Sequence, residues 1–266
     1  MEDVIAVQNS WDNLQAKKLA PIIKQALAEE KFEAVEASAE KYLTEWLDNE
    51  PQDLPNQAGP TIYHTLYLYI LKNTFSDELG EELYEKFITD GDAVNTLDRF
   101  LLSDSPWLDD VTTDIKENKN DIIIKSFNEA VTDLKKELGS NVSKWHWDSL
   151  HTITFDHPLG VKSGLNLIFN EGPYPNGGSN VTPGAASYPF NNPYATTSSA
   201  PWRYGVDLAD MNNGLDILFG GSSGHPFSSH YSNQIDKWLN GEYKAMWFSD
   251  EEIKEAAKGQ ITIIKP

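Results

Sequence analysis

The run GGSSG at residues 220–224 is the stretch best suited by residue type to nucleophilic chemistry. It contains the G-x-S-x-G pattern, which presents a serine, here Ser222, on a sharp turn after a strand. Candidates for the base and for the acid that would orient it are His225, His230 and Asp236. Pro226 interrupts the helix that should follow such a nucleophile, and no regular strand–helix alternation surrounds the run. A Ser-His-Asp hydrolase is therefore an alternative, not the main interpretation.

Metal and phosphate sites are the other chemistry that these residue types allow. The histidines concerned are His151, His157, His225 and His230, and the aspartates are Asp207, Asp210 and Asp216. The histidines lack the close helical spacing or convergent third ligand of a zinc site, and the aspartates match no EF-hand loop. The glycine run lacks the lysine of a P-loop. We therefore predict no metal site and expect the histidines to order loops by hydrogen bonding.

A pair of strands is expected to position the glycine run. Trp202–Leu208 alternates weakly between apolar and polar residues, and residues 215–219 suit a returning strand. Between them, Asp210–Gly214 contains the Asp, Asn and Gly types that favour a turn. After the loop, we expect a short helix that ends at Gly241. Its capping candidates are Ser228 and Ser229, and its apolar residues are Tyr231, Ile235, Trp238 and Leu239.

The first half of the sequence has the periodicity of amphipathic helices. Ser10 or Asp12 is placed to cap the first of them, Pro21 should kink or divide it, and Gly139 ends the last. Pro60 suits the start of a helix with a broad apolar face, which we expect deep in a bundle. The expected helices cover residues 14–27, 32–47, 60–71, 78–89, 93–102 and 121–138.

Composition changes at Gly139, after which Gly, Pro, Asn and Ser dominate and apolar runs are short. Helices followed by strands indicate an α+β fold, with a helical domain at residues 1–139 and a β-rich segment at residues 140–266. Residues 170–201 are long for a structureless loop, which favours a functional loop or one that lies against another part of the protein. The expected strands cover residues 150–155, 165–169, 204–208, 217–219 and 261–264.

Bulk composition bounds the class of protein. With 39% hydrophobic residues and 8 Trp among 266 residues, the chain can form one large core or two modest ones. Its formal charge of −20 argues against nucleic acid and anionic membranes as partners. Its cysteine count of 0 excludes a disulfide, a thiolate ligand and a cysteine nucleophile. We find neither an apolar run of membrane-spanning length nor a signal-peptide pattern.

Several stretches resemble the β-subunit of the penicillin amidase (penicillin acylase) family, in the family's order. The strongest are GGSSGHPFSSHYSNQIDKWLNGEY with VDLADMNNGLDIL before it, WHWDSLHTITFDHPLG at Trp145–Gly160, and GPYPNGGSNVTPGAASY at Gly172–Tyr188. Fainter ones are WDNLQAKKLAPIIKQAL at Trp11–Leu27 and FSDELGEELYEKF at Phe75–Phe87. The resemblance covers nearly the whole chain and is strongest from Trp145 onward.

The resemblance implies an N-terminal-nucleophile hydrolase, which cleaves the amide of an N-acylated small molecule through an acyl-enzyme. In that family the nucleophile is a serine that self-cleavage of a precursor exposes at the start of the β-subunit, and its α-amino group is the base. The matches begin about midway through the β-subunit, so we expect no catalytic residue here and no activity from this chain alone. Its strands would complete an α/β/β/α sandwich with the α-subunit and the N-terminal half of the β-subunit.

The resemblance also implies a periplasmic or extracellular enzyme of antibiotic metabolism that needs no cofactor, although calcium is compatible with the intact enzyme. In cephalosporin- and lactone-acylating relatives, a glutamate near the position of Ala200 or Pro201 orients a catalytic histidine, so the chain resembles the penicillin amidase branch instead. Arg203 matches an arginine that is common at this point in the family. If buried, it needs a carboxylate partner, which Asp207 or an absent segment could supply. The resemblance gives structural roles to Arg203, Asp207, Gly224, His230, Tyr231 and Gln234.

A stand-alone, non-catalytic binding module is the second hypothesis. In that case the aromatic and glycine-rich residues 170–201 hold a sugar or an acyl ligand. Such a module should be monomeric and melt as one unit, whereas a fragment should expose apolar strands and self-associate.

Overall fold

The structure, a computed structural model, describes residues 1–90, 92–103, 105–259 and 262. Contacts divide these residues into two compact units. The helical unit contains residues 10–154 and 172–199, and the sheet unit contains residues 1–9, 155–171 and the described residues from 200 onward. The helical unit continues past Gly139, where the composition changes, so the division into residues 1–139 and 140–266 stays a prediction.

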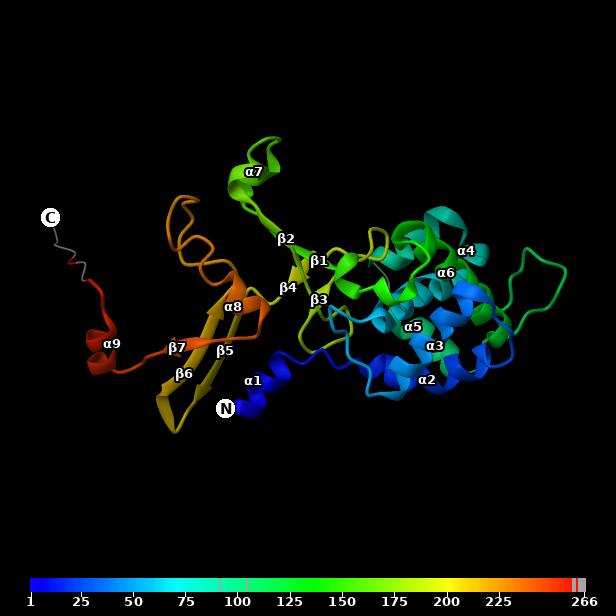
Figure 1. The fold of residues 1–266 in the computed structure, drawn as a ribbon, viewed down its shortest axis with the longest axis horizontal. Helices are drawn as coiled ribbons and strands as arrows, with labels where there is room; N and C mark the ends of the chain where they lie inside the picture. The colour runs from blue at the N-terminus through cyan, green and yellow to red at the C-terminus, as the bar shows by residue number, and fades with distance from the viewer. Residues whose placement is uncertain (91, 104, 260–261, 263–266) are drawn as a thin grey trace. The chain divides into compact units, whose positions relative to one another are not determined.

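The helical unit is a bundle whose helices follow the predicted order (Figure 1). They are α2 (Leu14–Leu27), α3 (Ala34–Asp48), α4 (Ala58–Asp90), α5 (Ala93–Leu102) and α6 (Lys119–Leu138). The first helix is capped by Asn13, not by Ser10 or Asp12, because the Asn13 side-chain oxygen accepts a hydrogen bond from the Ala16 N–H at 2.7 Å. Pro21 lies inside α2 without dividing it. Gly139 ends α6 as predicted.

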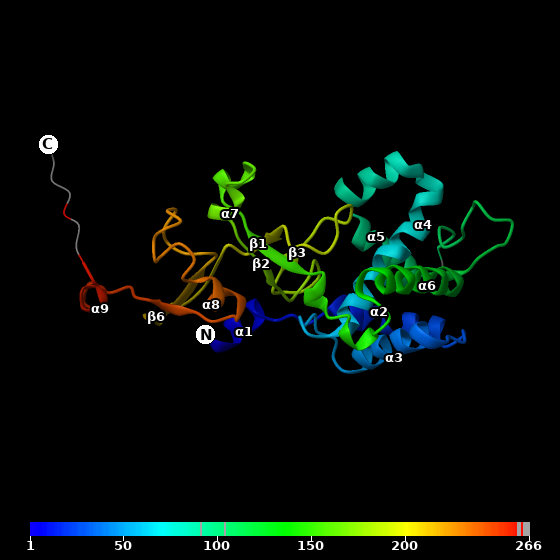
Figure 2. The same cartoon turned by 45° about the horizontal axis from the view of Figure 1, so that its top comes forward.

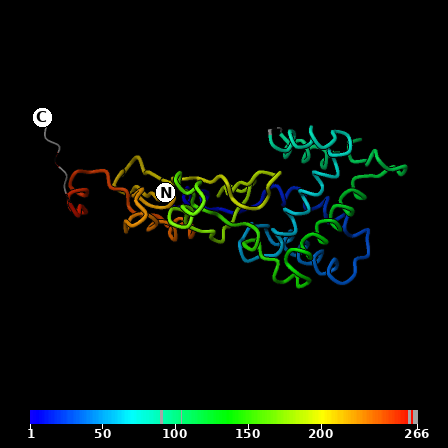
Figure 3. Tube along the Cα trace, turned by 90° about the horizontal axis from the view of Figure 1, so that it is seen from above, coloured from blue at the N-terminus to red at the C-terminus, as the bar shows by residue number. Residues whose placement is uncertain are grey.

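Helix α4 joins two segments that the sequence predicts as separate helices. Gly80 interrupts it with φ of 69° and ψ of 166°, a conformation that costs a glycine little. Figure 2 shows the bend of α4 and the turn into α5, and Figure 3 follows the same path through the connector into α6. The kink gives α4 two arms, and these two arms line a cavity described below.

The core of the helical unit lies between α4 and α6. Ile62, Leu66 and Ile70 on α4 are fully buried, as are Phe127 and Val131 on α6. Burying each such side chain stabilises the fold by about 1.5–3 kcal/mol. The broad apolar face predicted for the helix after Pro60 is therefore confirmed.

The loop predicted at residues 170–201 contains short strands and packs on its own unit. Gly177 lies against the Trp11 ring, where a Cβ would lie 2.8 Å from three ring atoms. The Trp147 indole N–H donates to the Gly178 carbonyl at 2.9 Å. Elements after α6 are the 3-10 turns η1 (Val142–Lys144) and η2 (Trp147–Ser149), and strands β1 (Thr152–Phe155), β2 (Glu171–Pro175), β3 (Ala186–Ser187) and β4 (Ser198–Ser199).

The sheet unit is built on a three-stranded antiparallel sheet in the order β5-β6-β7. Its elements are α1 (Glu2–Gln8), η3 (Pro158–Val161), α7 (Asn166–Phe169), β5 (Trp202–Asp207), β6 (Asp210–Leu218), α8 (Ile235–Leu239), β7 (Lys244–Met246) and α9 (Asp250–Ala256). Trp202 pairs with Leu218, and Tyr204 pairs with Asp216. None of the helices in the described residues combines the length and the apolar character needed to cross a bilayer.

The hairpin turn lies earlier than the sequence predicts. Asp207 pairs with Asp210, so the turn consists of Leu208 and Ala209, and the residues predicted as a turn belong to β6. The Asp207 carboxylate accepts the Ala209 N–H at 2.9 Å, which stabilises this turn. Asn212 tolerates the strand because its side-chain oxygen accepts the Ser249 N–H at 2.8 Å.

Two further local predictions are corrected by the structure, and a third concerns residues that are mostly outside the described ranges. The strand predicted at residues 165–169 is instead helix α7 (Asn166–Phe169), with Leu167 and Ile168 largely exposed. Helix α8 begins only at Ile235, too late for a serine cap at residue 228 or 229, and ends before Gly241, whose φ is +68°. The strand predicted at residues 261–264 falls almost wholly outside the described residues.

Candidate functional site

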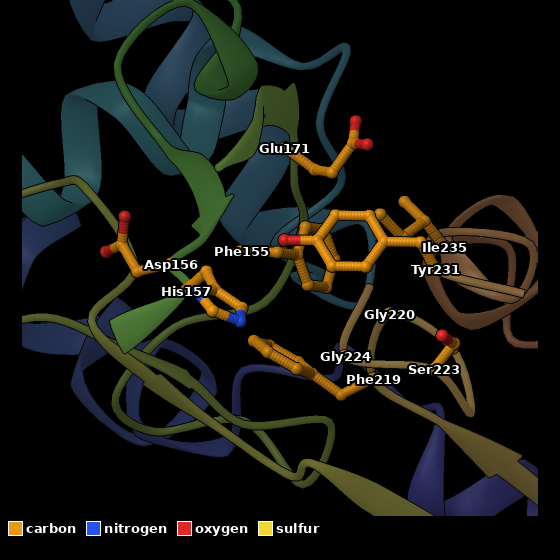
Figure 4. Close-up of a pocket in the computed structure, with 11 residues that line it drawn as sticks. Phe155, Asp156, His157, Glu171, Phe219, Gly220, Ser223, Gly224, Tyr231 and Ile235 are labelled. Carbon is orange, nitrogen blue, oxygen red and sulfur yellow. The ribbon is translucent and has the colours of Figure 1, made fainter. Parts of the chain in front are cut away.

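A cavity of about 170 Å³ in the sheet unit brings together two of the segments with the strongest sequence motifs. One wall is formed by residues 155–157, and another by residues 219–221, Ser223 and Gly224 with Tyr231 and Ile235 (Figure 4). Glu171 also lines the cavity. The two walls thus come from stretches that are more than 60 residues apart in the sequence.

Aromatic rings give this cavity a rigid base. The Phe155 and Phe219 rings are 4.4 Å apart, and Trp238 meets both edge-on at 5.7 and 5.8 Å. The Trp238 indole N–H donates to the Ala200 carbonyl at 3.1 Å, which fixes the indole orientation. Edge-to-face packing of this kind adds about 0.5–1.5 kcal/mol per pair beyond the buried area.

His157 lines this cavity with a titratable ring (Figure 4). Its ring stacks on Phe169 at 4.9 Å, and its Nδ1 accepts the Leu159 N–H at 3.1 Å. A neutral imidazole that accepts at Nδ1 carries its proton on Nε2. His157 therefore presents a donor, and the Asn170 side-chain oxygen holds its backbone by accepting the His157 N–H at 3.2 Å.

Tyr231 is also a donor. Its hydroxyl donates to the Phe169 carbonyl, and its ring lies 6.2 Å from His157. Burial, assisted by the nearby Glu171 carboxylate, raises the pKa of the Tyr231 phenol. The phenol therefore stays neutral near pH 7 and cannot act as a strong base there.

The glycine run folds back on the segment that follows it. A Cβ on Gly221 would lie 2.2 Å from the His230 carbonyl oxygen, and the Ser223 N–H donates to that oxygen at 3.1 Å. Gln234 is buried, and its side-chain oxygen accepts the Leu218 N–H at 3.0 Å. Gln234 therefore connects the end of β6 to α8.

Gly224 has no such constraint, since a Cβ there would meet nothing within 4 Å. The close backbone approach in the glycine run is thus at Gly221, which the sequence pattern did not distinguish from its neighbours. His230 is exposed, with Nδ1 3.4 Å from the Asn233 amide nitrogen, so it contributes mainly through its carbonyl. Asp207 is exposed and stabilises the hairpin turn.

The alternative triad around Ser222 is not assembled. Ser222 is exposed, and no helix follows it directly. The His225 N–H donates to Ser223 Oγ at 3.2 Å, and within the described chain no hydrogen bond joins Ser222 to either histidine. A serine without a base in contact has no means of losing its proton during attack.

Arg203 is held by aromatic and backbone groups. Its guanidinium lies 4.0 Å from the Trp238 ring centroid, and Nη1 donates to the Trp238 carbonyl at 3.1 Å and to Asn9 Oδ1 at 3.3 Å. Among the described residues Arg203 makes no ion pair with Asp207 or another carboxylate, and a carboxylate from an absent segment stays a prediction. Burial lowers the pKa of Arg203, although the guanidinium stays charged.

The described residues contain no group of three or more ligand-type side chains placed to hold a metal ion. Asp216 pairs with the Lys244 amine at 2.5 Å and accepts the Trp202 indole N–H at 3.3 Å. His151 is buried in the helical unit, whereas His157 lines the cavity of the sheet unit. Asp207 and Asp210 accept backbone N–H groups, so the three aspartates weighed as cation ligands have other partners in the described chain.

Sequence reasoning missed a buried polar cluster in the helical unit. His64 Nε2 lies 2.9 Å from Asp53 Oδ2, and the Asn13 amide donates to Asp53 at 3.0 Å. Trp147 is stacked between His64, at 4.7 Å, and His151, at 4.6 Å. The signal was a histidine on the otherwise apolar face of α4, a position where burial requires a hydrogen-bonding partner.

Comparisons with known proteins agree with these features. The family model described as penicillin amidase matches residues 1–255. An acyl-homoserine lactone acylase QuiP of Pseudomonas fluorescens (strain Pf0-1) is 29% identical over 238 residues, covering 86% of this chain and 28% of the relative. The QuiP of Pseudomonas aeruginosa (strain PAO1) is 30% identical, covering 68% of this chain and 24% of the relative. The chain thus spans about a quarter of the length of these relatives.

A penicillin acylase is also similar. The penicillin acylase 2 proenzyme of Pseudomonas sp. (strain SE83) is 29% identical over half of this chain, covering 17% of the relative. Because the lactone acylases match over more of the chain, the expected preference for the penicillin amidase branch is not supported. That expectation depended on the residue type near Ala200 alone.

In fold, the chain is similar to a thermostable penicillin G acylase from Alcaligenes faecalis. The TM-score is 0.54 at 15% identity, and the match covers 97% of this chain and 48% of that chain. At this identity the likeness concerns the fold alone. It confirms the predicted α+β fold, with a helical first half and strands that belong to an N-terminal-nucleophile hydrolase sandwich.

Proposed function

Because the chain belongs to the penicillin amidase family, we propose that it is the C-terminal portion of an amidohydrolase that is processed from a precursor. The intact enzyme cleaves the amide bond of an N-acylated small molecule through an acyl-enzyme. This chain supplies the helical unit and the closing strands, while the serine nucleophile lies on the preceding segment. The partners of the chain are then the α-subunit and the N-terminal half of the β-subunit.

One observation carries this proposal. The family match extends over residues 1–255, yet the cavity that gathers the family-like motifs has no nucleophile in contact with a base among the described residues. His157 presents a donor, the Tyr231 hydroxyl already donates to the Phe169 carbonyl, and Ser222 is exposed without a base in contact among the described residues. Such a site can position neighbouring structure, but it cannot start an acyl transfer.

The names of the similar proteins suggest the first substrates to test. Acyl-homoserine lactones and penicillins both contain an acyl group in amide linkage, and acylases for both resemble this chain. We place N-acyl-homoserine lactones first, because the matches to the lactone acylases cover more of the chain. We also propose that the enzyme acts in the periplasm or outside the cell, without an organic cofactor.

The proposal is tested on the product of the whole reading frame that encodes this chain. N-terminal sequencing should show that the mature subunit carrying residues 1–255 begins with a serine upstream of Met1. That product should release amine from N-octanoyl-homoserine lactone or from penicillin G. An unprocessed product, or one that releases amine from neither substrate, contradicts the proposal.

A further inference from the structure

A second cavity, of about 340 Å³, lies in the helical unit. Its walls come from the two arms of α4 at residues 68–72 and 84–88, from Asp133 on α6, and from loop residues 190–194. The volume is at the lower end of the range of about 300–1,000 Å³ that is typical of small-molecule sites. No part of the function proposed above uses this cavity.

Four half-buried aromatic side chains line it, namely Tyr69, Tyr84, Phe190 and Tyr194. Tyr69, Tyr84 and Phe190 pack partly against the core of the helical unit. Large aromatic side chains stabilise a fold most when their apolar surface is completely buried. Rings that are left half covered around a concave surface are typical of a ligand site.

Tyr194 is fixed in place at the cost of backbone strain. Its φ is +82°, a conformation that costs a residue with a side chain about 1–3 kcal/mol. Its hydroxyl lies 3.0 Å from Thr65 Oγ1, and its carbonyl accepts the His151 Nδ1–H at 2.6 Å. Both ends of the residue are therefore held, so the ring is set before any ligand arrives.

Polar groups of both kinds surround the rings. The Lys72 amine lies 5.9 Å from the Tyr69 ring centroid and makes no ion pair within the described residues. Asp133 and Glu85 supply carboxylates, and the exposed Asn191 supplies an amide. Burial and the neighbouring Asp133 carboxylate raise the pKa of Tyr69 to about 12, so its phenol stays neutral.

These charges narrow the class of ligand. Two carboxylates and a net charge of −20 repel anions, while the Lys72 amine, which already lies over the Tyr69 ring, disfavours a second cation at that ring. The remaining chemistry is that of a neutral molecule with flat apolar faces and several hydroxyl groups. We propose that this cavity binds a neutral carbohydrate, with sugar rings against the aromatic side chains and hydroxyls on Lys72, Asp133 and Asn191.

The experiment is calorimetric titration of the whole chain with maltotriose, cellotriose and N,N′,N″-triacetylchitotriose. At least one trisaccharide should bind, and Asn191→Ala and Tyr84→Ala should each weaken that binding by about tenfold. Asn191 is exposed, so its substitution leaves the fold intact even if Tyr84→Ala does not. The matched control is Phe227→Ala, an 84% exposed aromatic in the sheet unit, which should leave the affinity unchanged.

Three results would overturn the proposal. The first is no binding of any of the trisaccharides at millimolar concentration to folded protein. The second is binding that neither cavity variant changes. The third is binding of phenylacetate but of no trisaccharide, with the phenylacetate binding abolished by Lys72→Met. That result would make the cavity a site for aromatic acids.

Discussion

The guanidinium of Arg203 lies 4.0 Å from the centroid of the Trp238 ring and also donates to the Trp238 carbonyl at 3.1 Å. Strand β5 and helix α8 are therefore joined at one residue pair by a cation–π contact and a hydrogen bond. A third contact, from Arg203 Nη1 to Asn9 Oδ1 at 3.3 Å, adds the segment after α1 to the same junction.

Arg203→Ala should lower the free energy of unfolding by about 2 kcal/mol, because it removes the cation–π contact and two hydrogen bonds. Arg203→Lys should recover only part of this, since an ammonium cannot stack as a planar guanidinium does. Urea unfolding followed by tryptophan fluorescence measures both values. Equal stability of the lysine variant and the unchanged protein would show that charge alone matters at this position.

Gly221→Ala should destabilise the chain by about 1–3 kcal/mol, because the new methyl group would lie against backbone that cannot move without breaking the loop. A Cβ there would lie 2.2 Å from the His230 carbonyl and 2.6 Å from that of Tyr231. Gly224→Ala, three residues away, is the matched control and should be nearly neutral. If thermal melting shows equal decreases in melting temperature for both variants, the close approach of Gly221 to the His230 carbonyl is incorrect.

The contribution of His151 to the free energy of unfolding should decrease as the pH falls from about 6.5 to about 4, because His151 is buried in its neutral form. Burial lowers the pKa of His151 to about 4 from its ordinary value of 6.5. In that pH window the unfolded chain binds a proton that the folded chain does not, which favours unfolding by on the order of 3 kcal/mol at the acid end. Urea unfolding from pH 7.5 to pH 4 measures the effect.

His151→Asn should flatten this pH dependence relative to the unchanged chain. Asp53 acts in a more acidic window. Burial opposes its charge, but His64 and the hydrogen bonds from Ser179 and Asn13 outweigh it and lower the pKa of Asp53. The contribution of Asp53 to the free energy of unfolding is present above the ordinary carboxyl pKa. It is lost as the pH falls through the lowered pKa of the folded chain. An unaltered slope above pH 4 in the His151→Asn variant would exclude His151 as the cause.

Helix positions were the most predictable part of the fold, because apolar periodicity and end signals agree there. The helix ended by Gly139 is an example, since φ of +82° at that residue suits glycine and few others. Strand signals were weaker. Residues 165–169 are apolar enough for a strand, yet they form α7, because a short apolar run has no periodicity that separates the two states.

The hairpin turn was misplaced for a related reason. Asn212 and Asn213 are turn-type residues, but side-chain hydrogen bonds satisfy them inside β6, whereas the turn itself uses Leu208 and Ala209. Local residue type could not show that Asp207 would stabilise the turn from its first position.

The cavity was only partly predictable from the sequence. The motifs that contribute His157 and Gly221 were identified, but their proximity depends on contacts across more than 60 residues of sequence. No local signal distinguished Gly221, which is forced by close packing, from Gly224, which is not. No local signal predicted the partner of Arg203 either, which is an indole rather than a carboxylate.

The most direct measurement is amine release from N-octanoyl-homoserine lactone and penicillin G by this purified chain alone, beside its Ser222→Ala variant. We predict no release above the buffer blank from either protein, because we propose that the nucleophile lies on the segment that precedes this chain. Turnover by the unchanged chain that Ser222→Ala abolishes would contradict the account and place the catalytic serine in the glycine run.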